Sequence, residues 1–218
     1  DRELAWASFW FLGQSHKINK FRVIAIEIQD LVLNEKLFDA SSLLDRYISN
    51  NGWSLWAVEL RCAIEQLMNG TEAQKKWSAA LQASATNTIP GLLMHIFSER
   101  DEEVTSHDSF YSKCQDSFPR YKTISNWMPR YLLYRAIGQM DDPRIAFPTA
   151  FAREATSCLV DYYESFIDCI KTICNQKSLS DLRLNALAVV ENLRANGFID
   201  HRLDKLQFAL GGSISSDA

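Results

Sequence analysis

Glycine and proline are scarce in this sequence, which has 8 glycines and 5 prolines among its 218 residues. No stretch of Val, Ile and Thr alternates with polar residues for long, which argues against a β architecture of short strands joined by tight turns. Apolar residues recur instead at helical spacing. We therefore predict an all-α fold of about eleven helices, stacked as antiparallel helical hairpins in an irregular α-solenoid or multi-helical bundle.

Long apolar runs are also absent. No run reaches about 18 apolar residues, so we predict no transmembrane helix and no membrane partner. The five cysteines are an odd number and include no CxxC pair. This pattern indicates free thiols in a reducing compartment, and we expect a cytoplasmic protein without metal or cofactor. The first residue is not Met, so we expect the chain to be one region of a longer protein.

Common catalytic motifs are missing as well. The sequence contains no glycine-rich phosphate loop, no GxSxG, no HExxH and no ExxH pair. These absences argue against the commonest enzyme classes. The net charge of −4 argues against nucleic-acid binding over the whole surface, but it allows a local basic patch.

The helical pattern places boundaries at glycine, proline and capping residues. We predict helices at about 2–13, 18–35, 37–50, 53–69, 72–85, 89–100, 106–114, 123–138, 148–176, 181–196 and 200–210. Ser106 or Asp108 is expected to cap the helix that runs through residue 114, and Ser178 or Ser180 the helix over 181–196. Pro129 either kinks the helix over 123–138 or marks its true start. Residues 1–103 read as a helical-repeat-like region and residues 104–211 as an irregular helical region packed on it, in one continuous domain. Residues 212–218 read as a disordered tail.

Two of these helices share a packing pattern. Each places a small residue first, a large apolar residue four positions later, and a further pair at seven and eight; the sets are Ala40, Leu44, Tyr47, Ile48 and Ala73, Trp77, Ala80, Leu81. The intervening helix is expected to face inward through Ala57, Leu60, Ile64 and Leu67. Over residues 18–85 this pattern resembles the tetratricopeptide repeat, although Arg61 and Glu27 depart from its first-helix pattern.

The resemblance implies a scaffold whose first helices line a groove for a peptide or partner helix, with Arg61 and Glu65 near it. Tryptophan is concentrated in the same part of the chain, and we expect Trp53 and Trp56 at the partner-binding surface. Most of these rings are expected to fill the core between stacked helices, while an exposed one would mark a binding site.

Residues 120–135 form the most basic and aromatic stretch. Arg120, Arg130 and Arg135 interleave with Trp127 and Tyr131. These residues suit a protein partner, because Trp, Tyr and Arg are favoured at interface hot spots. They suit single-stranded nucleic acid less well, and they also suit internal packing with the cations paired to the acidic run 99–103.

Arg100 and His107 have the spacing R-x6-H. This spacing resembles the active-site motif of the HEPN ribonucleases, which are all-α and need no metal. The resemblance implies that the Arg stabilises charge at a phosphate while the His moves a proton. A charged helix end followed by a cap explains the same residues more simply.

Three carboxylates, Asp161, Glu164 and Asp168, share one face of a predicted helix, and we expect that face to be solvated. His95 lies in an apolar helix and is expected in the core. The leading hypothesis is a non-catalytic helical interaction module or scaffold that binds a peptide or helix of a partner protein. The alternatives are a HEPN-like ribonuclease using Arg100 and His107, or nucleic-acid binding through residues 120–135.

Overall fold

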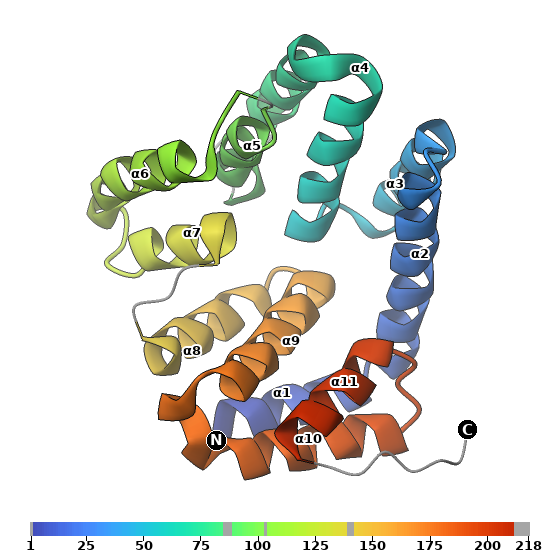
Figure 1. Ribbon diagram of the computed structural model, residues 1–218, viewed down its shortest axis with the longest axis vertical. Helices are drawn as coiled ribbons and strands as arrows, with labels where there is room; N and C mark the ends of the chain where they lie inside the picture. The colour runs from blue at the N-terminus through green and yellow to red at the C-terminus, as the bar shows by residue number, and fades with distance from the viewer. Residues whose placement is uncertain (1, 85–88, 103, 139–141, 212–218) are drawn as a thin grey trace. The chain divides into compact units, whose positions relative to one another are not determined.

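The computed structural model describes residues 2–84, 89–102, 104–138 and 142–211. Within these ranges it has eleven α-helices, two short 3-10 helices and no strand, which confirms the all-α class (Figure 1). The predicted stacking of hairpins into a solenoid or bundle stays a prediction. No helix in this part of the chain is long and apolar enough to cross a membrane.

The chain forms two compact units. Unit 1 comprises residues 1–23 and 143–218, and unit 2 comprises the continuous segment 24–142. One boundary lies inside helix α2 (Ser15–Leu33), between Val23 and Ile24. The predicted division after residue 103 coincides with neither boundary and stays a prediction. Residue 103 and the predicted tail lie outside the described residues.

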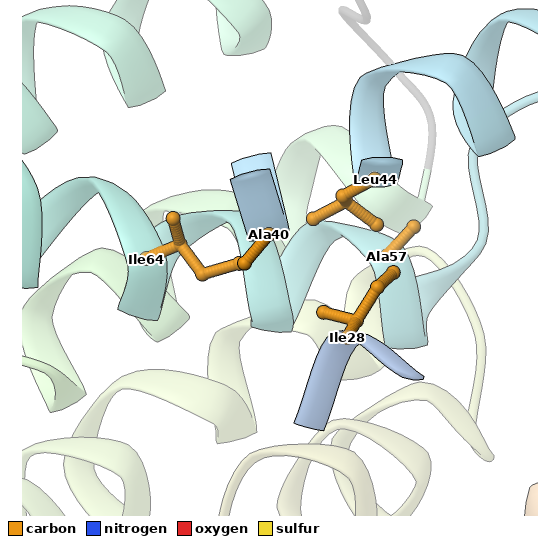
Figure 2. Packing of buried hydrophobic residues seen from close by; sticks show 5 residues of the cluster. All are labelled: Ile28, Ala40, Leu44, Ala57 and Ile64. Carbon is orange, nitrogen blue, oxygen red and sulfur yellow. The ribbon is translucent and has the colours of Figure 1, made fainter. Parts of the chain in front are cut away.

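The first half of unit 2 is built on one apolar cluster. It joins Ile28 of α2, Ala40 and Leu44 of α3 (Leu37–Asn51), and Ala57 and Ile64 of α4 (Leu55–Ser84) (Figure 2). Small residues let the helices approach closely while the branched side chains fill the space between them. The predicted inward positions Ala40, Leu44, Ala57 and Ile64 are therefore confirmed, whereas Leu67 is exposed.

Helix α4 merges two predicted helices around Gly70, whose φ of 78° and ψ of 178° are not helical. Beyond this bend the buried positions are Gln74 and Ser78, not the predicted apolar set at 73, 77, 80 and 81. The Oγ of Ser98 donates to Gln74 Oε1 over 2.8 Å. A polar contact thus holds the second part of α4 to the next helix, and the burial pattern of α3 does not recur there.

The second half of unit 2 contains α5 (Ile89–Arg100), α6 (His107–Ser117), the 3-10 helix η1 (Phe118–Thr123) and α7 (Met128–Ile137). Helix α5 packs against α4, α6 and α7. The Oγ of Ser106 accepts a hydrogen bond from the backbone N–H of Ser109, which confirms the predicted cap of α6. Pro129 lies in the first turn of α7, where its missing N–H costs nothing.

Unit 1 is organised around α9 (Leu159–Asn175), which packs against α1 (Arg2–Leu12), α8 (Pro143–Glu154), α10 (Arg183–Ala195), α11 (His201–Leu210) and the 3-10 helix η2 (Lys177–Leu182). Phe11 of α1 lies with its ring 4.8 Å from that of Tyr162, 5.4 Å from that of Tyr163 and 5.2 Å from that of Phe166. These fully buried rings form the centre of the unit 1 core.

The prediction of one helix over residues 148–176 is wrong. Helix α8 begins earlier, at Pro143, includes Pro148 and ends at Glu154. The hydroxyls of Thr156 and Ser157 donate to the carbonyl of Arg153, and such local bonds compete with helix continuation. The predicted side-chain cap at Ser178 or Ser180 is also wrong, because η2 precedes α10 and no side chain caps it.

Candidate functional site

The predicted groove residues Arg61 and Glu65 do come together, within a largely enclosed cluster. The Arg61 guanidinium lies 3.4 Å from Asp45, 3.3 Å from Glu65 and 5.5 Å from the Trp77 ring centre. It also donates to Ser41 Oγ over 2.8 Å. These contacts hold α3 to both parts of α4, and the predicted role of the cluster in partner binding stays a prediction.

The two predicted partner-binding tryptophans differ in their surroundings. Trp53 is partly exposed and its ring lies 6.2 Å from that of Trp77. Trp56 packs edge-on against Tyr47 at 5.5 Å and against the apolar cluster of Figure 2. Trp56 therefore supports the core of unit 2, while Trp53 keeps an accessible edge.

Arg100 and His107 have separate partners. Arg100 Nη1 lies 2.6 Å from Glu59, and its Nε donates to Asp101 over 3.1 Å. Burial by itself would lower the pKa of Arg100, but these two carboxylates raise it above its ordinary value. His107 is 81 % exposed and lies 3.6 Å from Asp108. Neither side chain has the other among its partners, so the geometry gives the ribonuclease alternative no support.

The basic and aromatic stretch does not form a single surface. Tyr131 is buried, and Trp127 packs edge-on against it at 5.7 Å. Arg130 is exposed on α7. Arg135 lies over a neighbouring tyrosine ring, at 5.7 Å. Arg120, at the exposed start of the stretch, lines a cleft.

That cleft lies between α5, α6 and η1 and has a volume of about 350 Å³. Leu92 and Ile96 of α5, Phe110 of α6 and Phe118 of η1 make its apolar floor. Phe110 and Phe118 are buried, so the floor is anchored in the core of unit 2. The volume falls in the range of pockets that accept a side chain or a small ligand. We call this site the α5–α6 cleft.

The rim of the α5–α6 cleft is charged. Lys113 of α6 donates to Glu99 Oε1 over 2.5 Å, and His95 Nε2 lies 3.3 Å from the same oxygen. His95 and Glu99 face each other because they are one helical turn apart on α5. Arg120 donates to the hydroxyl of Tyr121 over 3.0 Å and lies 4.9 Å from the centre of its ring.

His95 was expected in the core, and that prediction is wrong because its side chain is 59 % exposed at this rim. Its neighbours Met94 and Ile96 occupy the buried face instead. The sequence indicated only part of the cleft. The sequence shows that His95 and Glu99 are one helical turn apart on the same helix. The position of Lys113 opposite them depends on how α6 packs on α5, which the sequence does not show.

Thiol chemistry is disfavoured in the described residues. Cys114 lines the α5–α6 cleft, and burial raises its pKa to about 11, with Glu99 adding to the effect. Burial also raises the pKa of Cys158 to about 11 and those of Cys62 and Cys169 to about 12. These thiols are protonated at neutral pH and are therefore poor nucleophiles. The described residues contain no group of three side chains suited to hold a metal ion.

A network of charged side chains lies in unit 1. We call it the Asp200 cluster, and it comprises Arg22, Tyr163, Glu164, Asp200 and Arg202. Asp200 Oδ2 lies 3.0 Å from Arg22 Nε and 2.6 Å from Arg202 Nη2, and it accepts from the Tyr163 hydroxyl over 3.2 Å. Arg202 also donates to both oxygens of Glu164, over 2.7 and 2.8 Å. The charges of two arginines and two carboxylates cancel. Because the paired side chains come from α2, α9 and the start of α11, their ion pairs hold these helices together as an internal clamp.

This cluster corrects the prediction of a solvated carboxylate face on α9. Glu164 is engaged by Arg202, and Asp161 is buried. Asp168 is the only one of the three that fits the expectation, since it is half-exposed and accepts from Lys171 over 3.1 Å. The arginines that bind Glu164 lie far away in the sequence, where helical spacing cannot reveal them.

Comparison with known proteins adds no further guide to the function. No family model, curated protein or solved structure matches the chain.

Proposed function

We propose that this protein is a non-catalytic helical interaction module that captures an acidic segment of a partner protein in the α5–α6 cleft. One observation carries the proposal: an apolar floor is bordered by a stacked arginine and by a lysine on one wall. This is the combination expected of a site that takes one apolar anchor side chain and holds an adjacent carboxylate.

The floor provides affinity. A leucine or phenylalanine side chain fits a cleft of about 350 Å³. Full burial of such a side chain is worth about 1.5–3 kcal/mol. Because Ile96, Phe110 and Phe118 of the floor are buried in the core, the cleft needs little ordering when the partner binds, which lowers the free-energy cost of association.

The rim provides the preference for acidic partners. Lys113 and Arg120 outnumber Glu99, so these three side chains give the rim a net positive charge. Arg120 is stacked on Tyr121, which limits its freedom and presents its planar guanidinium for paired hydrogen bonds to a carboxylate.

A nucleic-acid partner has less support. Tyr131, one of the rings proposed for base stacking, is buried. The ribonuclease alternative is weakened in the same way by the separate partners of Arg100 and His107.

The test is selection of binders from a display library of random linear peptides on the intact chain, followed by fluorescence anisotropy of the enriched peptides. We expect enriched sequences that combine an acidic residue with a leucine or an aromatic residue. Arg120→Glu should weaken their binding at least about tenfold. The matched control is Arg46→Glu, an exposed arginine on α3 of the same unit, which should leave binding within about twofold.

The proposal is overturned if no peptide is enriched, or if the enriched peptides bind Arg120→Glu as tightly as the unaltered chain. Leu92→Ala separates the two parts of the site, because it removes a partly buried floor residue and leaves the rim charge unchanged. A labelled oligouridine strand is the final probe. Tighter binding of oligouridine than of any peptide would favour the nucleic-acid alternative.

A further inference from the structure

A second hollow lies in unit 1, between α1, α8, α9 and η2, and has a volume of about 280 Å³. Apart from three charged residues at its edge, its lining is apolar. The walls include Leu4, Phe147, Phe151, Ile173 and Leu179, all of which are buried. Nothing in the proposed function uses this site, which we call the α1–α8 cavity.

The chemistry of the apolar walls disfavours a strongly polar ligand. Pro148 forms part of the α8 wall and has no backbone N–H to donate. Cys169 presents a protonated thiol, because burial raises its pKa to about 12. A ligand that needs several hydrogen bonds would lose them on entry, whereas an apolar ligand would lose only its contact with water.

The size of the α1–α8 cavity sets the size of the ligand. An engineered apolar cavity of about 150 Å³ stays dry and binds benzene. The α1–α8 cavity, at about 280 Å³, has room for two fused rings. Ordinary ligand pockets begin near about 300 Å³, so a larger molecule would not be enclosed.

The charges at the edge favour an uncharged ligand. Arg144 of α8 donates to Asp181 Oδ1 of η2 over 2.8 Å and to the carbonyl of Ser178 over 3.0 Å. Glu3 adds a second carboxylate at the edge. A ligand carboxylate would therefore meet two acidic side chains and an arginine already engaged. The Arg144–Asp181 pair is about half-exposed on both sides, and pairs of this kind are weak enough to open.

We infer that the α1–α8 cavity is a binding site for an uncharged bicyclic aromatic ligand, which enters past the Arg144–Asp181 ion pair. The ligand buries its rings against Leu4, Phe147 and Ile173. A single polar group on the rings can remain at the edge, beside Arg144.

The experiment uses indole as the probe and the intact chain labelled with carbon-13 at its methyl groups. We expect saturable shifts of the Leu4, Ile173 and Leu179 methyl signals, with a dissociation constant below about 1 mM. Indole-3-acetate, which adds a carboxylate, should bind at least about tenfold more weakly. Absence of saturable shifts with indole, or equal binding of the two probes, overturns the inference.

A matched pair of variants locates the site. Leu182→Trp fills the cavity from its partly buried edge and should weaken indole binding at least about tenfold. Leu184→Trp makes the same change two residues away at a position that is 79 % exposed, and binding should stay within about twofold. If Leu182→Trp fails to fold, Cys169→Met adds bulk to the same cavity and is judged by the same criterion. Equal indole binding by the filled variant and the control overturns the inference, whatever the outcome for the α5–α6 cleft.

Discussion

Replacing Asp200 by asparagine gives the sharpest test of the packing of unit 1. The carboxylate is fully buried and binds two arginines, one of which, Arg22, is itself only 3 % exposed. Asparagine has nearly the same shape, but it removes the charge and replaces one acceptor oxygen by an NH2 donor. The variant leaves Arg22 and Arg202 with a single anion, Glu164, in an enclosed site.

The expected loss is large because neither Asp200 nor Arg22 can regain water. Breaking a buried ion pair by removing one partner costs about 3–5 kcal/mol. Since Glu164 still binds Arg202 through both oxygens, we expect Asp200→Asn to fall at the lower end, about 3 kcal/mol. Asp200 Oδ1 also caps α11 by accepting from the backbone N–H of Arg202, a role that asparagine keeps and alanine loses. Asp200→Ala should therefore cost about 1 kcal/mol more than Asp200→Asn.

The matched control is Asp204→Asn on the same helix. Asp204 lies 2.6 Å from Arg194, but its side chain is 44 % exposed. Exposed ion pairs are worth about 0–1 kcal/mol after screening by solvent. The same chemical change should therefore lower the free energy of unfolding several times less at Asp204 than at Asp200.

The assay is urea unfolding followed by far-UV circular dichroism, with the free energy compared at an unchanged slope. Amide hydrogen exchange of α9 and α11 gives a local check, since those helices should lose protection first. Similar costs for Asp200→Asn and Asp204→Asn would refute the reasoning that burial makes the Asp200 cluster a clamp.

Three further results are expected. Burial alone would raise the pKa of Asp200, but hydrogen bonds and charge from its arginines hold that pKa below the ordinary 3.8. The stabilising contribution of Asp200 is therefore present above about pH 4 and is lost as the pH falls further. The urea midpoint should fall more between about pH 5 and pH 3 in the unaltered chain than in Asp200→Asn. Gly70→Ala places a side chain on a backbone conformation essentially restricted to glycine, and it should lower the free energy of urea unfolding by about 1–3 kcal/mol. The control is Gly13→Ala, where the added methyl meets only an ordinary contact at 3.5 Å and φ is not positive. That variant should be neutral or slightly stabilising. Cys62 and Cys169, with pKa values of about 12, should resist iodoacetamide near pH 8 until urea unfolds the chain, as mass spectrometry of labelled peptides would show.

Local signals in the sequence predicted most of the helices well. The serine cap at Ser106 and the glycine bend at Gly70 act on neighbouring residues only, so the sequence contains the information needed to place them. The start of α7 follows the same rule, because the helix begins at Met128 with Pro129 in its first turn, one of the two positions that the proline predicted. The apolar cluster of Figure 2 was also readable from spacing along α3 and the first part of α4.

The wrong predictions have a common physical cause. Other hydrogen-bonding partners compete with the regular helical pattern, and the spacing of apolar residues does not reveal them. Residues 148–176 have helical periodicity, yet the hydroxyls of Thr156 and Ser157 bind the backbone of α8 close to where that helix ends. In the second part of α4, the apolar pattern predicted the buried face, but Gln74 and Ser78 are buried because α5 offers a polar partner. Only the packed neighbour reveals that preference.

The candidate sites were less predictable than the helices. Arg120 was singled out from the sequence, but the residues opposite it, Glu99 and Lys113, come from two other helices. The α1–α8 cavity gave no sequence signal, because its lining comes from both ends of the chain. A cavity forms where side chains from several helices fail to fill the space between them. The apolar pattern along one helix shows only which of its side chains face the core.

The discontinuous composition of unit 1 has a consequence for the order of folding. Asn19 donates to the carbonyl of Gly197 across 178 residues of sequence, and closing so long a loop costs about 5 kcal/mol in chain entropy. Unit 2 is a continuous segment within that loop, and its prior folding shortens the flexible part and lowers the cost by about 1 kcal/mol. Unit 2 can also form during synthesis, before α10 and α11 leave the ribosome, whereas unit 1 waits for them. A destabilising substitution in the apolar cluster of Figure 2 should therefore slow the assembly of unit 1 as well, although none of the cluster residues takes part in the contact between Asn19 and Gly197.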